Sequence, residues 1–592
     1  MPIPSSPPIT NAYIAAVFQQ LADLTELTGG NRFKIIAFQK VVRTLEDLPQ
    51  PVADMDRRLL SKIQGIGSGT AGRIAELLDT GRLADLDALL DEVPHGLLAV
   101  MDVPGLGPKT VALLWRGASV TSVEDLKAKA ESGELETLKG FGKKKSANIL
   151  KNLAFAAASG GRIRIGRAHQ LATTFIQLLG ELPGVEKVQY AGSLRRGRET
   201  IGDVDLLCAA LPIAASAIFD AFVSHAHVSD VLLRGDTKCS VRMGEGDTAL
   251  QVDLRVVHPD SFGAALMYFT GSKEHNVKLR ERAQAQSLSL NEYGLWKETE
   301  KGAKKKPLAS ATEDEVYKAL GLAWVPPELR EDRGEIALAE KNNLPALLTL
   351  ADVKAELHSH TTASDGKWSI EENARAAAAR GFHTVAITDH SKGQAQANGL
   401  SNERLEQHIV AIHAAAQKLK GVIRVLAGSE VDILADGSLD YPDELLAQLD
   451  IVVASPHAAL TQEPKKATAR LIKAIENPYV SIIGHPTGRI VNRREGLSPD
   501  LPALFKAAAE RGVALEINAN PYRLDLRDSH ARLFIHEYGG KIAINTDAHG
   551  LGDLDHLQFG VSTARRAGAT AHDVVNCLGL DELANWIAST RP

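Results

Sequence analysis

Seven short apolar segments in the C-terminal part of the chain limit its fold more than any other sequence feature. The segments are 353–358, 385–390, 425–431, 451–457, 480–485, 513–518 and 542–549. Helical, Ala-rich patterns such as 405–419 and 501–511 separate most of them, and strands that alternate with helices are expected to pair in parallel. Nearly every segment ends in His, Asp or Glu, and residues at the carboxyl ends of barrel strands converge on one site. The pattern predicts a barrel with a polar site at one end.

The side chains at these strand ends form a candidate metal site. Residues two apart in a strand share a face, so His358 and His360 point the same way, as do Asp547 and His549. Imidazole and carboxylate ligands together suit Zn²⁺ or Mn²⁺. The nine candidates are His358, His360, Asp365, His390, Glu430, His457, His485, Asp547 and His549. By contrast, His408 and His413 fall inside a predicted helix and are interpreted as surface residues.

A second acidic cluster lies in the middle of the chain. In a strand over 203–207, Asp203 and Asp205 share one face, and a second strand over 251–257 places Asp253 in the same way. Carboxylates on one face repel each other unless cations lie between them. Three carboxylates and the phosphates of a nucleotide would hold two Mg²⁺ or Mn²⁺ ions. Gly192 and Ser193 precede a helical stretch that could cradle a triphosphate, and Arg196 would add a charged donor.

Three segments of the N-terminal region repeat a Gly-apolar-Gly turn followed by a helical pattern: 63–71, 103–111 and 138–147. Free N–H groups at a helix start can hold a phosphate oxygen. The repeat resembles the helix-hairpin-helix motif, which binds DNA phosphates without reading sequence. The resemblance implies DNA binding by Gly65, Gly67, Gly105, Gly107, Gly140 and Gly142, with Lys109, Lys143 and Lys144 beside them.

The net charge of −6 hides an uneven distribution of charged residues. Residues 137–180 contain eight Lys and Arg and no acid, which suits a phosphate backbone. Of the 19 histidines, 13 lie after residue 330, which suits metal chemistry in that part. No apolar run approaches the ~18 residues of a membrane span. The first residues lack a signal-peptide pattern, and the three cysteines form no CxxC, so we expect a cytoplasmic, nucleoid-associated protein without membrane contact.

The string from Gly192 to Asp205 resembles the palm of family X DNA polymerases, which belong to the nucleotidyltransferase superfamily. Residues 268–276 and 291–293 resemble the thumb of that family. The resemblance implies Asp203, Asp205 and Asp253 as catalytic metal ligands. It also implies a nucleotide site of Gly192, Ser193, Arg196, Arg164, Tyr268, Phe269, Gly271, Lys273 and Asn276, with Arg280 against the template strand. At the position of the Schiff-base lysine of lyase-competent relatives the chain has Arg73, so we expect little lyase activity.

The strings His-Ser-His, Thr-Asp-His, Ser-Pro-His, Gly-His-Pro and Thr-Asp-Ala-His resemble the PHP family of phosphoesterases. The resemblance implies a distorted (β/α)₇ barrel that holds a trinuclear cluster of Zn²⁺ and/or Mn²⁺. We therefore expect a multidomain chain with helical helix-hairpin-helix domains (1–85 and 86–158), an α+β nucleotidyltransferase palm (159–260), a thumb (261–325), a polar linker (326–350) and an α/β PHP barrel (351–592).

Together the two resemblances predict a monomeric repair enzyme that acts on gapped or nicked double-stranded DNA with dNTPs. The palm would fill short gaps, and the barrel would supply 3′–5′ exonuclease or other 3′-end processing, with AP endonuclease activity left open. One alternative is a PHP-type phosphatase with a DNA-binding, non-polymerising N-terminal module. The hairpin repeats argue against a metabolite phosphatase. A second alternative, a non-catalytic DNA-binding scaffold, conflicts with the intact carboxylate set.

Overall fold

The protein is described here from a computed structural model. The residues it describes are 11–48, 52–63, 65–94, 96–101, 103, 106–138, 141–143, 145–147, 149–150, 153, 162–226, 228–243, 250–297 and 306–592. They form two compact units: one holds the described residues up to 153, and the other holds the described residues from 162 onward. No helix among these residues is long and apolar enough to cross a membrane.

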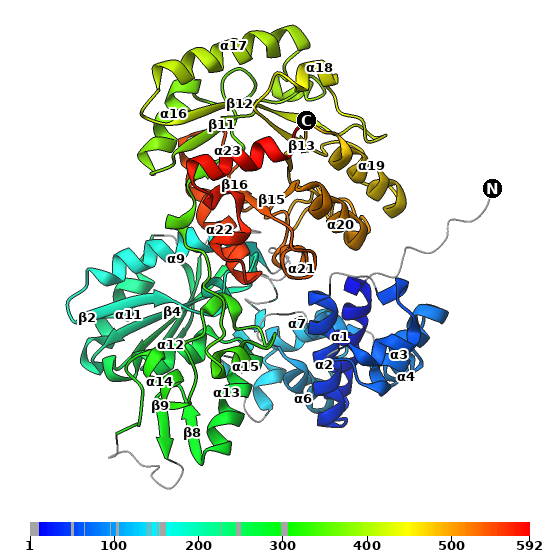
Figure 1. Ribbon diagram of the computed structural model, residues 1–592. Coiled ribbons are helices and arrows are strands. Elements are labelled where there is room, and N and C mark those ends of the chain that lie inside the picture. The colour runs from blue at the N-terminus through cyan, green and yellow to red at the C-terminus, as the bar shows by residue number, and fades with distance from the viewer. Residues whose placement is uncertain are drawn as a thin grey trace. The chain divides into compact units, whose positions relative to one another are not determined.

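The N-terminal unit is helical and has one continuous apolar core. Helix α1 contacts α2, α4 and α6 (Figure 1). Helix α3 begins directly after Gly67 and α6 directly after Gly107, as the Gly-apolar-Gly turns predict. The main helices are α1 (Asn11–Leu27), α2 (Arg32–Asp47), α3 (Ser68–Thr80), α4 (Ala84–Glu92), α5 (Gly96–Met101), α6 (Pro108–Ala118) and α7 (Val123–Glu131).

The first module of the second unit, the palm, is a five-stranded sheet in the order β2-β4-β7-β6-β5. The strands are β2 (Val185–Tyr190), β4 (Asp203–Ala210), β5 (Val228–Arg234), β6 (Lys238–Met243) and β7 (Leu250–Val257). Apolar residues of α9 (Ile165–Gly180) and α11 (Ala215–Val223) share a core with β4 and β7. Strands β4 and β7 pair in parallel with Asp205 opposite Asp253, so the two predicted strands are neighbours.

The thumb follows, with α12 (Phe262–Thr270), α13 (Lys273–Ala285), the hairpin of β8 (Leu288–Asn291) and β9 (Gly294–Lys297), and α14 (Glu313–Ala319). The segment 326–350, expected to be a polar linker, instead folds onto the thumb. It forms η8 (Pro327–Leu329) and α15 (Glu335–Glu340). Leu329 and Ala339 are buried in the same core as Val316 and Leu320, and Ile336, Leu344 and Leu347 pack against that core.

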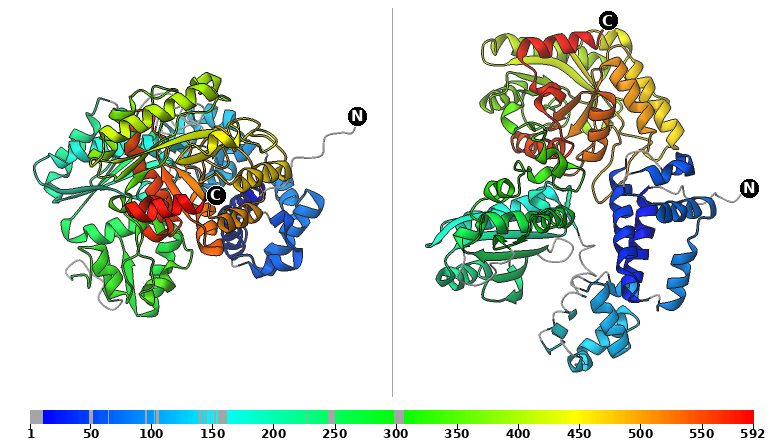
Figure 2. Two further views of the ribbon diagram at one scale, coloured as in Figure 1. Left: turned by 45° about the horizontal axis from the view of Figure 1, so that its top comes forward. Right: turned by 60° about the horizontal axis from the view of Figure 1, so that its bottom comes forward.

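The last module is a seven-stranded parallel sheet in the order β10-β11-β12-β13-β14-β15-β16, with helices around it (Figure 2). A parallel bridge between Ser359 and Ala548 joins the first and last strands beyond their ends, so the sheet nearly closes into a barrel. All seven predicted strands are present. They are β10 (Ala355–Glu356), β11 (Thr384–Ile387), β12 (Arg424–Asp432), β13 (Ile451–Ser455), β14 (Ile482–Ile483), β15 (Ala514–Asn518) and β16 (Ile542–Asn545).

Helices connect and cover the barrel strands. Their apolar faces form the outer core together with the outward side chains of the strands. Predicted helices at 405–419 and 501–511 match α17 and α20. The helices are α16 (Ile370–Ala379), α17 (Asn402–Lys418), α18 (Asp443–Leu446), α19 (Pro464–Glu476), α20 (Leu501–Arg511), α21 (Asp528–Tyr538), α22 (Leu557–Arg566) and α23 (Leu580–Ser589).

A buried ion-pair network joins palm, thumb and barrel within the second unit. Nη1 of Arg566 donates to the carbonyl of Arg196 at 2.7 Å and to Glu331 at 2.8 Å, and its Nη2 lies 3.0 Å from Asp528. Nε of Arg196 also donates to Glu331, at 3.1 Å. Buried charges persist only when they are paired, so these contacts hold the three modules together.

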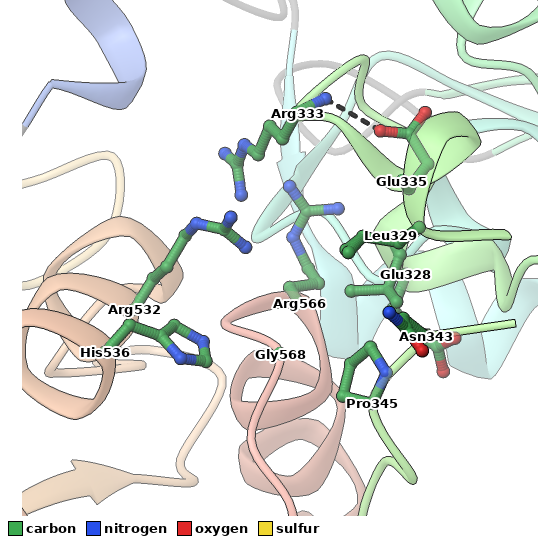
Figure 3. A pocket seen from close by; sticks show the side chains of 11 residues that line it. Glu328, Leu329, Arg333, Glu335, Asn343, Pro345, Arg532, His536, Arg566 and Gly568 are labelled. Atoms are coloured by element: carbon green, nitrogen blue, oxygen red, sulfur yellow. Dashed lines mark hydrogen bonds between the residues drawn. The ribbon is translucent and has the colours of Figure 1, made fainter. Parts of the chain in front are cut away.

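A cavity of about 310 Å³ opens beside this network (Figure 3). The side chains of Arg333, Arg532 and Arg566 point toward one another there. Glu328 also lines the cavity and accepts a hydrogen bond at 2.7 Å from Arg565 of α22. The end of the thumb and the barrel helices therefore meet through paired charged side chains, beside a cavity that Leu329, Leu338 and Pro345 also line.

We predict that Glu331→Gln weakens this junction. Burial alone raises the pKa of Glu331, but Arg566 and Arg196 outweigh it and lower the pKa to about 2. A carboxyl with a lowered folded-state pKa stabilises the protein above its unfolded pKa, and this contribution is lost as the pH falls toward 2. The shift corresponds to about 3 kcal/mol at neutral pH.

Urea unfolding followed by tryptophan fluorescence tests this expectation. At pH 7, Glu331→Gln should lower the free energy of unfolding by about 3 kcal/mol, and by roughly 1 kcal/mol less at pH 3.5. The exposed Glu340→Gln, which lies on the neighbouring helix α15, should change it by less than about 0.5 kcal/mol. If the two variants had the same free energy of unfolding, the stabilising role given to the network would be contradicted.

Candidate functional site

The structure brings all nine predicted barrel ligands together at the carboxyl ends of the strands. Three overlapping groups have ligand atoms within 4.8 Å of one another: His360, Asp365, His390 and His549; His358, His360, Glu430 and Asp547; and His390, Glu430 and His457. Nε2 of His485 lies 2.9 Å from Glu430. Glu430 belongs to two of the groups and contacts His485, so it lies at the centre of the cluster.

The unsatisfied atoms of this cluster fit divalent cations. Among the described residues of this cluster, His358 Nε2, His360 Nδ1 and His485 Nδ1 are buried and make no hydrogen bond, and His390 Nδ1 and Glu430 Oε2 lie 2.8 Å from each other without hydrogen-bond geometry. Burying such atoms without partners is unfavourable. Imidazole nitrogens and carboxylate oxygens at this spacing are the ligands that Zn²⁺ and Mn²⁺ take. The residues present therefore fit a metal cluster.

Carboxylates make the electrostatic field negative around two of the ligands, His457 and His549. Burial lowers the pKa of His457, but Glu430 and Asp432 outweigh it and raise the pKa to about 9. Similarly, burial lowers the pKa of His549, but Asp365 and Asp547 raise it to about 9. A field that stabilises protonated imidazole also attracts metal cations.

Several carboxylates that the sequence patterns did not single out orient the ligands. His358 Nδ1 lies 2.7 Å from Glu516 on β15, and His457 Nδ1 lies 2.6 Å from Asp432 on β12. Each contact leaves the other ring nitrogen, Nε2, turned toward Glu430. Carboxylates that hold metal-binding histidines in this way fix the ring orientation and increase ligand basicity.

The interpretation of His408 as a surface residue is wrong. His408 is buried, and its Nε2 lies 2.7 Å from Oδ2 of Asp389. Asp389 also accepts hydrogen bonds from Thr361 and Ser364, which flank the ligands His360 and Asp365. His408 shares the apolar face of α17 with Leu405 and Ile412, so helical periodicity was the available signal. His413, on the opposite face, is exposed as predicted.

The palm carboxylates lie on paired strands, as predicted. Lys238 Nζ lies 2.5 Å from Asp253, and Gln251 donates to Asp253 at 2.9 Å. Burial, followed by repulsion from Asp203 and Asp253, raises the pKa of Asp205 to about 7. The side chains around Asp205 therefore supply too little positive charge for it. This donor set of carboxylate oxygens suits Mg²⁺ or Mn²⁺.

Gly192 allows the turn before α10 (Gly192–Arg195) to approach this cluster. Its φ is +61°, and a Cβ atom there would lie 2.3 Å from Oδ2 of Asp205. Any side chain would therefore collide with the carboxylate, in a backbone conformation that favours glycine. Ser193, the next residue, lies on the same turn.

The two arginines of the predicted nucleotide site contact other modules, Arg196 the thumb and Arg164 the barrel. Arg196 is paired with Glu331 and donates to the Thr270 carbonyl. Arg164 lies 4.0 Å from the ring centre of Tyr522 and donates to the Val491 carbonyl at 3.3 Å, and both partners are barrel residues. The structure therefore engages both guanidinium groups in interdomain contacts, and their role toward a triphosphate stays a prediction.

The other predicted nucleotide-site residues gather between α12 and α13. The rings of Tyr268 and Phe269 are 5.1 Å apart, and Arg255 lies 4.3 Å from the Phe269 ring centre. Asn276 donates to the Tyr268 carbonyl at 2.6 Å. Gly271 ends α12 with φ +71°, Lys273 is exposed, and Arg280 is half-buried on α13.

The predicted DNA-binding residues of the helical unit lie at helix starts. Gly67 and Gly107 immediately precede α3 and α6, and Lys109 is exposed, with its Nζ 3.6 Å from Glu26. Gly65 has φ +105°, which favours glycine in the first turn. Gly142 and Lys143 are exposed, whereas Gly105, Gly140 and Lys144 lie outside the described residues. Arg73, at the position of the expected lyase lysine, donates to Asp85, and weak lyase activity stays a prediction.

Family models match four parts of the chain. They are a helix-hairpin-helix domain over residues 9–83, a SAM-like helix-hairpin-helix tandem over 97–154, a DNA polymerase beta thumb over 265–331 and a PHP domain over 356–520. These matches agree with the helical unit, the thumb and the barrel described above.

Three relatives illustrate the similarity over longer stretches. "DNA polymerase/3'-5' exonuclease PolX" of Bacillus subtilis (strain 168) is 38% identical over 575 residues, which cover 97% of this chain and 98% of the relative. "DNA polymerase lambda" of Rattus norvegicus is 27% identical over 349 residues, 55% of this chain and 58% of the relative. A protein named "Probable phosphatase" from Thermoanaerobacter sp. (strain X514) is 32% identical over 231 residues, 37% of this chain and 89% of the relative.

We predict that His408→Leu weakens metal binding by the barrel about 10–100-fold, the range for partners that orient metal ligands. The substitution removes the hydrogen bond to Asp389, which positions the residues beside His360 and Asp365. Chelator competition for Zn²⁺ measures the affinity. His413→Leu on the exposed face of the same helix is the control and should bind Zn²⁺ as the wild type does. If His408→Leu bound Zn²⁺ as tightly as the wild type, Asp389 would keep its position without the hydrogen bond from His408.

Proposed function

Because the chain belongs to the bacterial PolX family of DNA polymerase/3′–5′ exonucleases, we propose that its palm fills short DNA gaps and its barrel trims 3′ ends. One observation carries this proposal: two chemically different ligand sets occur in one chain. The palm offers the three carboxylates Asp203, Asp205 and Asp253, and the barrel offers a mixed imidazole and carboxylate cluster.

In the palm, Asp203, Asp205 and Asp253 would hold two Mg²⁺ or Mn²⁺ ions. Such ions lower the pKa of a hydroxyl and neutralise phosphate charge. The primer 3′-oxygen forms a bond to the α-phosphorus of a dNTP and loses its proton, and the bond to pyrophosphate breaks. Gly192 and Ser193 would donate hydrogen bonds to phosphate oxygens. Tyr268, Phe269 and Asn276, which contact one another, would lie beside the sugar of the dNTP.

In the barrel, the nine ligands would hold Zn²⁺ and/or Mn²⁺ ions, which supply a nucleophile at neutral pH. Water adds to the phosphorus of the terminal nucleotide, the bond to the preceding 3′-oxygen breaks, and that oxygen takes up a proton. The products are a nucleoside 5′-monophosphate and a primer with a free 3′-hydroxyl. Glu516, Asp432 and Asp389 keep the ligands oriented for this reaction.

The substrate would be gapped or nicked double-stranded DNA, bound by the helix starts at Gly67 and Gly107 and by the basic stretch 137–180. A second function, hydrolysis of a small phosphate monoester, has support in the similarity of the barrel to proteins named "Probable phosphatase". The helix-hairpin-helix and thumb matches favour the DNA substrate, because a metabolite phosphatase has no use for them.

We predict that Asp253→Asn abolishes nucleotide addition and leaves DNA binding nearly unchanged. The substitution keeps the shape of the side chain but removes a metal-binding charge, while the DNA contacts lie elsewhere. Primer extension on a one-nucleotide gap in Mg²⁺ measures the activity, and filter binding measures affinity. The exposed Asp260→Asn is the control and should extend normally. Extension by Asp253→Asn at the control rate would contradict the carboxylate assignment.

We also predict that His360→Ala removes 3′–5′ excision while dNTP incorporation on a clean primer persists. His360 belongs to two of the three ligand groups, so its loss affects most of the cluster. Gel analysis of a labelled primer in Mn²⁺, with and without dNTPs, separates the two activities. The exposed His572→Ala should retain both. If Asp205→Asn rather than His360→Ala removed excision, the nuclease would not reside in the barrel.

A further inference from the structure

The barrel loop at residues 489–492 is bound to the edge of the palm by hydrogen bonds and an ion pair. Asn492 Nδ2 donates to the Arg162 carbonyl at 2.9 Å, and Arg164 donates to the Val491 carbonyl at 3.3 Å. Arg489 forms an ion pair with Glu199 at 2.6 Å. The palm side of this contact is the pair β1 (Ile163–Arg164) and β3 (Thr200–Ile201), which directly precedes β4 and its carboxylates.

At the palm end of this contact, Arg162 lies beside the catalytic carboxylates. Its Nε donates to Thr200 Oγ1 at 3.0 Å. A Cβ atom on Gly202 would lie 3.1 Å from Nη1 of Arg162, and Gly202 is followed by Asp203. The exposed guanidinium group is therefore next to the residue that begins the predicted polymerase site.

At the barrel end, the contact reaches the metal-ligand cluster. Val491 N–H donates to the Tyr522 carbonyl at 2.8 Å, so the loop runs beside Tyr522 and Arg523. Nε of Arg523 lies 3.8 Å from Oδ2 of Asp547, a predicted ligand. A continuous series of contacting residues, from Arg162 through the loop at 491–492 to Arg523, therefore connects the surroundings of Asp203 with Asp547.

Tyr522 has the environment of a stacking platform. One face of its ring carries the Arg164 guanidinium, 4.0 Å from the ring centre, yet 52% of the residue is exposed. A large exposed aromatic side chain beside cations is the arrangement on which unpaired bases stack in single-stranded DNA sites. A base inside a duplex cannot reach such a ring.

The loop also lines a polar cavity of about 370 Å³ whose wall contains Arg489, Arg493, Arg494 and Arg527, with Glu199 and Glu495 as the acids. Glu199 is paired with Arg489, and Arg493 is exposed. The cavity wall therefore carries an excess of positive charge where a phosphate backbone would pass between the two sites.

We propose that Arg162, Arg164, Arg493, Tyr522 and Arg523, the basic seam, bind the unpaired 3′ segment of a primer and lead it from the palm to the barrel. The proposal rests on the nuclease function given to the barrel. Arginines contact successive phosphates, and Tyr522 stacks on an unpaired base. Because only a frayed end offers unstacked bases, the basic seam selects mispaired 3′ ends over paired ones.

The test uses the full-length protein and a labelled primer with three unpaired 3′ nucleotides on its template. Mn²⁺ is added together with excess unlabelled DNA, so each protein acts in a single encounter. Tyr522→Leu and Arg493→Ala should each excise the tail about tenfold more slowly, because the first loses a stacked base and the second a phosphate contact. Both should extend a paired, gapped primer at the wild-type rate. Arg511→Ala, an exposed arginine at the end of α20, should match the wild type in both assays.

A small diester, the p-nitrophenyl ester of thymidine 5′-monophosphate, reports on the ligand cluster without using the basic seam. Equal hydrolysis by wild type and variants, with slower tail excision in the variants, supports the proposal. If both variants excise the tail at the wild-type rate, the proposal is overturned. It is also overturned if the variants lose diester hydrolysis to the same extent as tail excision, because the residues would then act on the ligand cluster itself. If the wild-type protein excises no tail, the nuclease function fails instead.

Discussion

The arrangement of the modules in the second unit depends on the hydrogen bonds and ion pairs of Arg566. This one buried guanidinium group contacts the palm through the Arg196 carbonyl, the thumb through Glu331 and the barrel through Asp528. A buried arginine without its carboxylates would be strongly unfavourable, so the three modules must close around it together. The palm and barrel sites consequently keep a fixed relation, which is what a shared path for a DNA end requires.

The two sites use different ligands to hold cations among clustered carboxylates. In the palm, three carboxylates on β4 and β7 repel one another, and Lys238 neutralises only part of their charge. In the barrel, histidines contribute most of the ligand atoms, and carboxylates such as Glu516 and Asp432 orient them from behind. Oxygen ligands suit Mg²⁺, whereas the mixed set suits Zn²⁺ or Mn²⁺, so one chain can hold different metals at once.

Short sequence patterns predicted those parts of the fold that depend on residues close together in the chain. Two-residue alternation put Asp203 and Asp205 on one strand face and Asp253 on a face of a second strand, which the structure pairs with the first, and the polar ends of the strands identified the barrel ligands. Contacts between distant residues left no such pattern, as for Arg196 with Glu331 or Arg164 with Val491. The segment 326–350 looked like a polar linker because charged residues are concentrated in its first part, at 328–335. His408 was misread because a single polar residue on an apolar helix face is easily taken as exposed.

The packing of 326–350 against both thumb and barrel limits how this protein can be divided or recombined. Arg565 and Arg566 of α22 have their partners Glu328 and Glu331 in that segment. A gene fission or domain swap at residue 351 would remove Glu328 and Glu331 and leave Asp528 as the remaining one of the three carboxylates that pair with Arg565 and Arg566. The barrel can therefore be exchanged between relatives only as a segment that begins near residue 326, so the unit that moves between proteins is longer than the barrel itself.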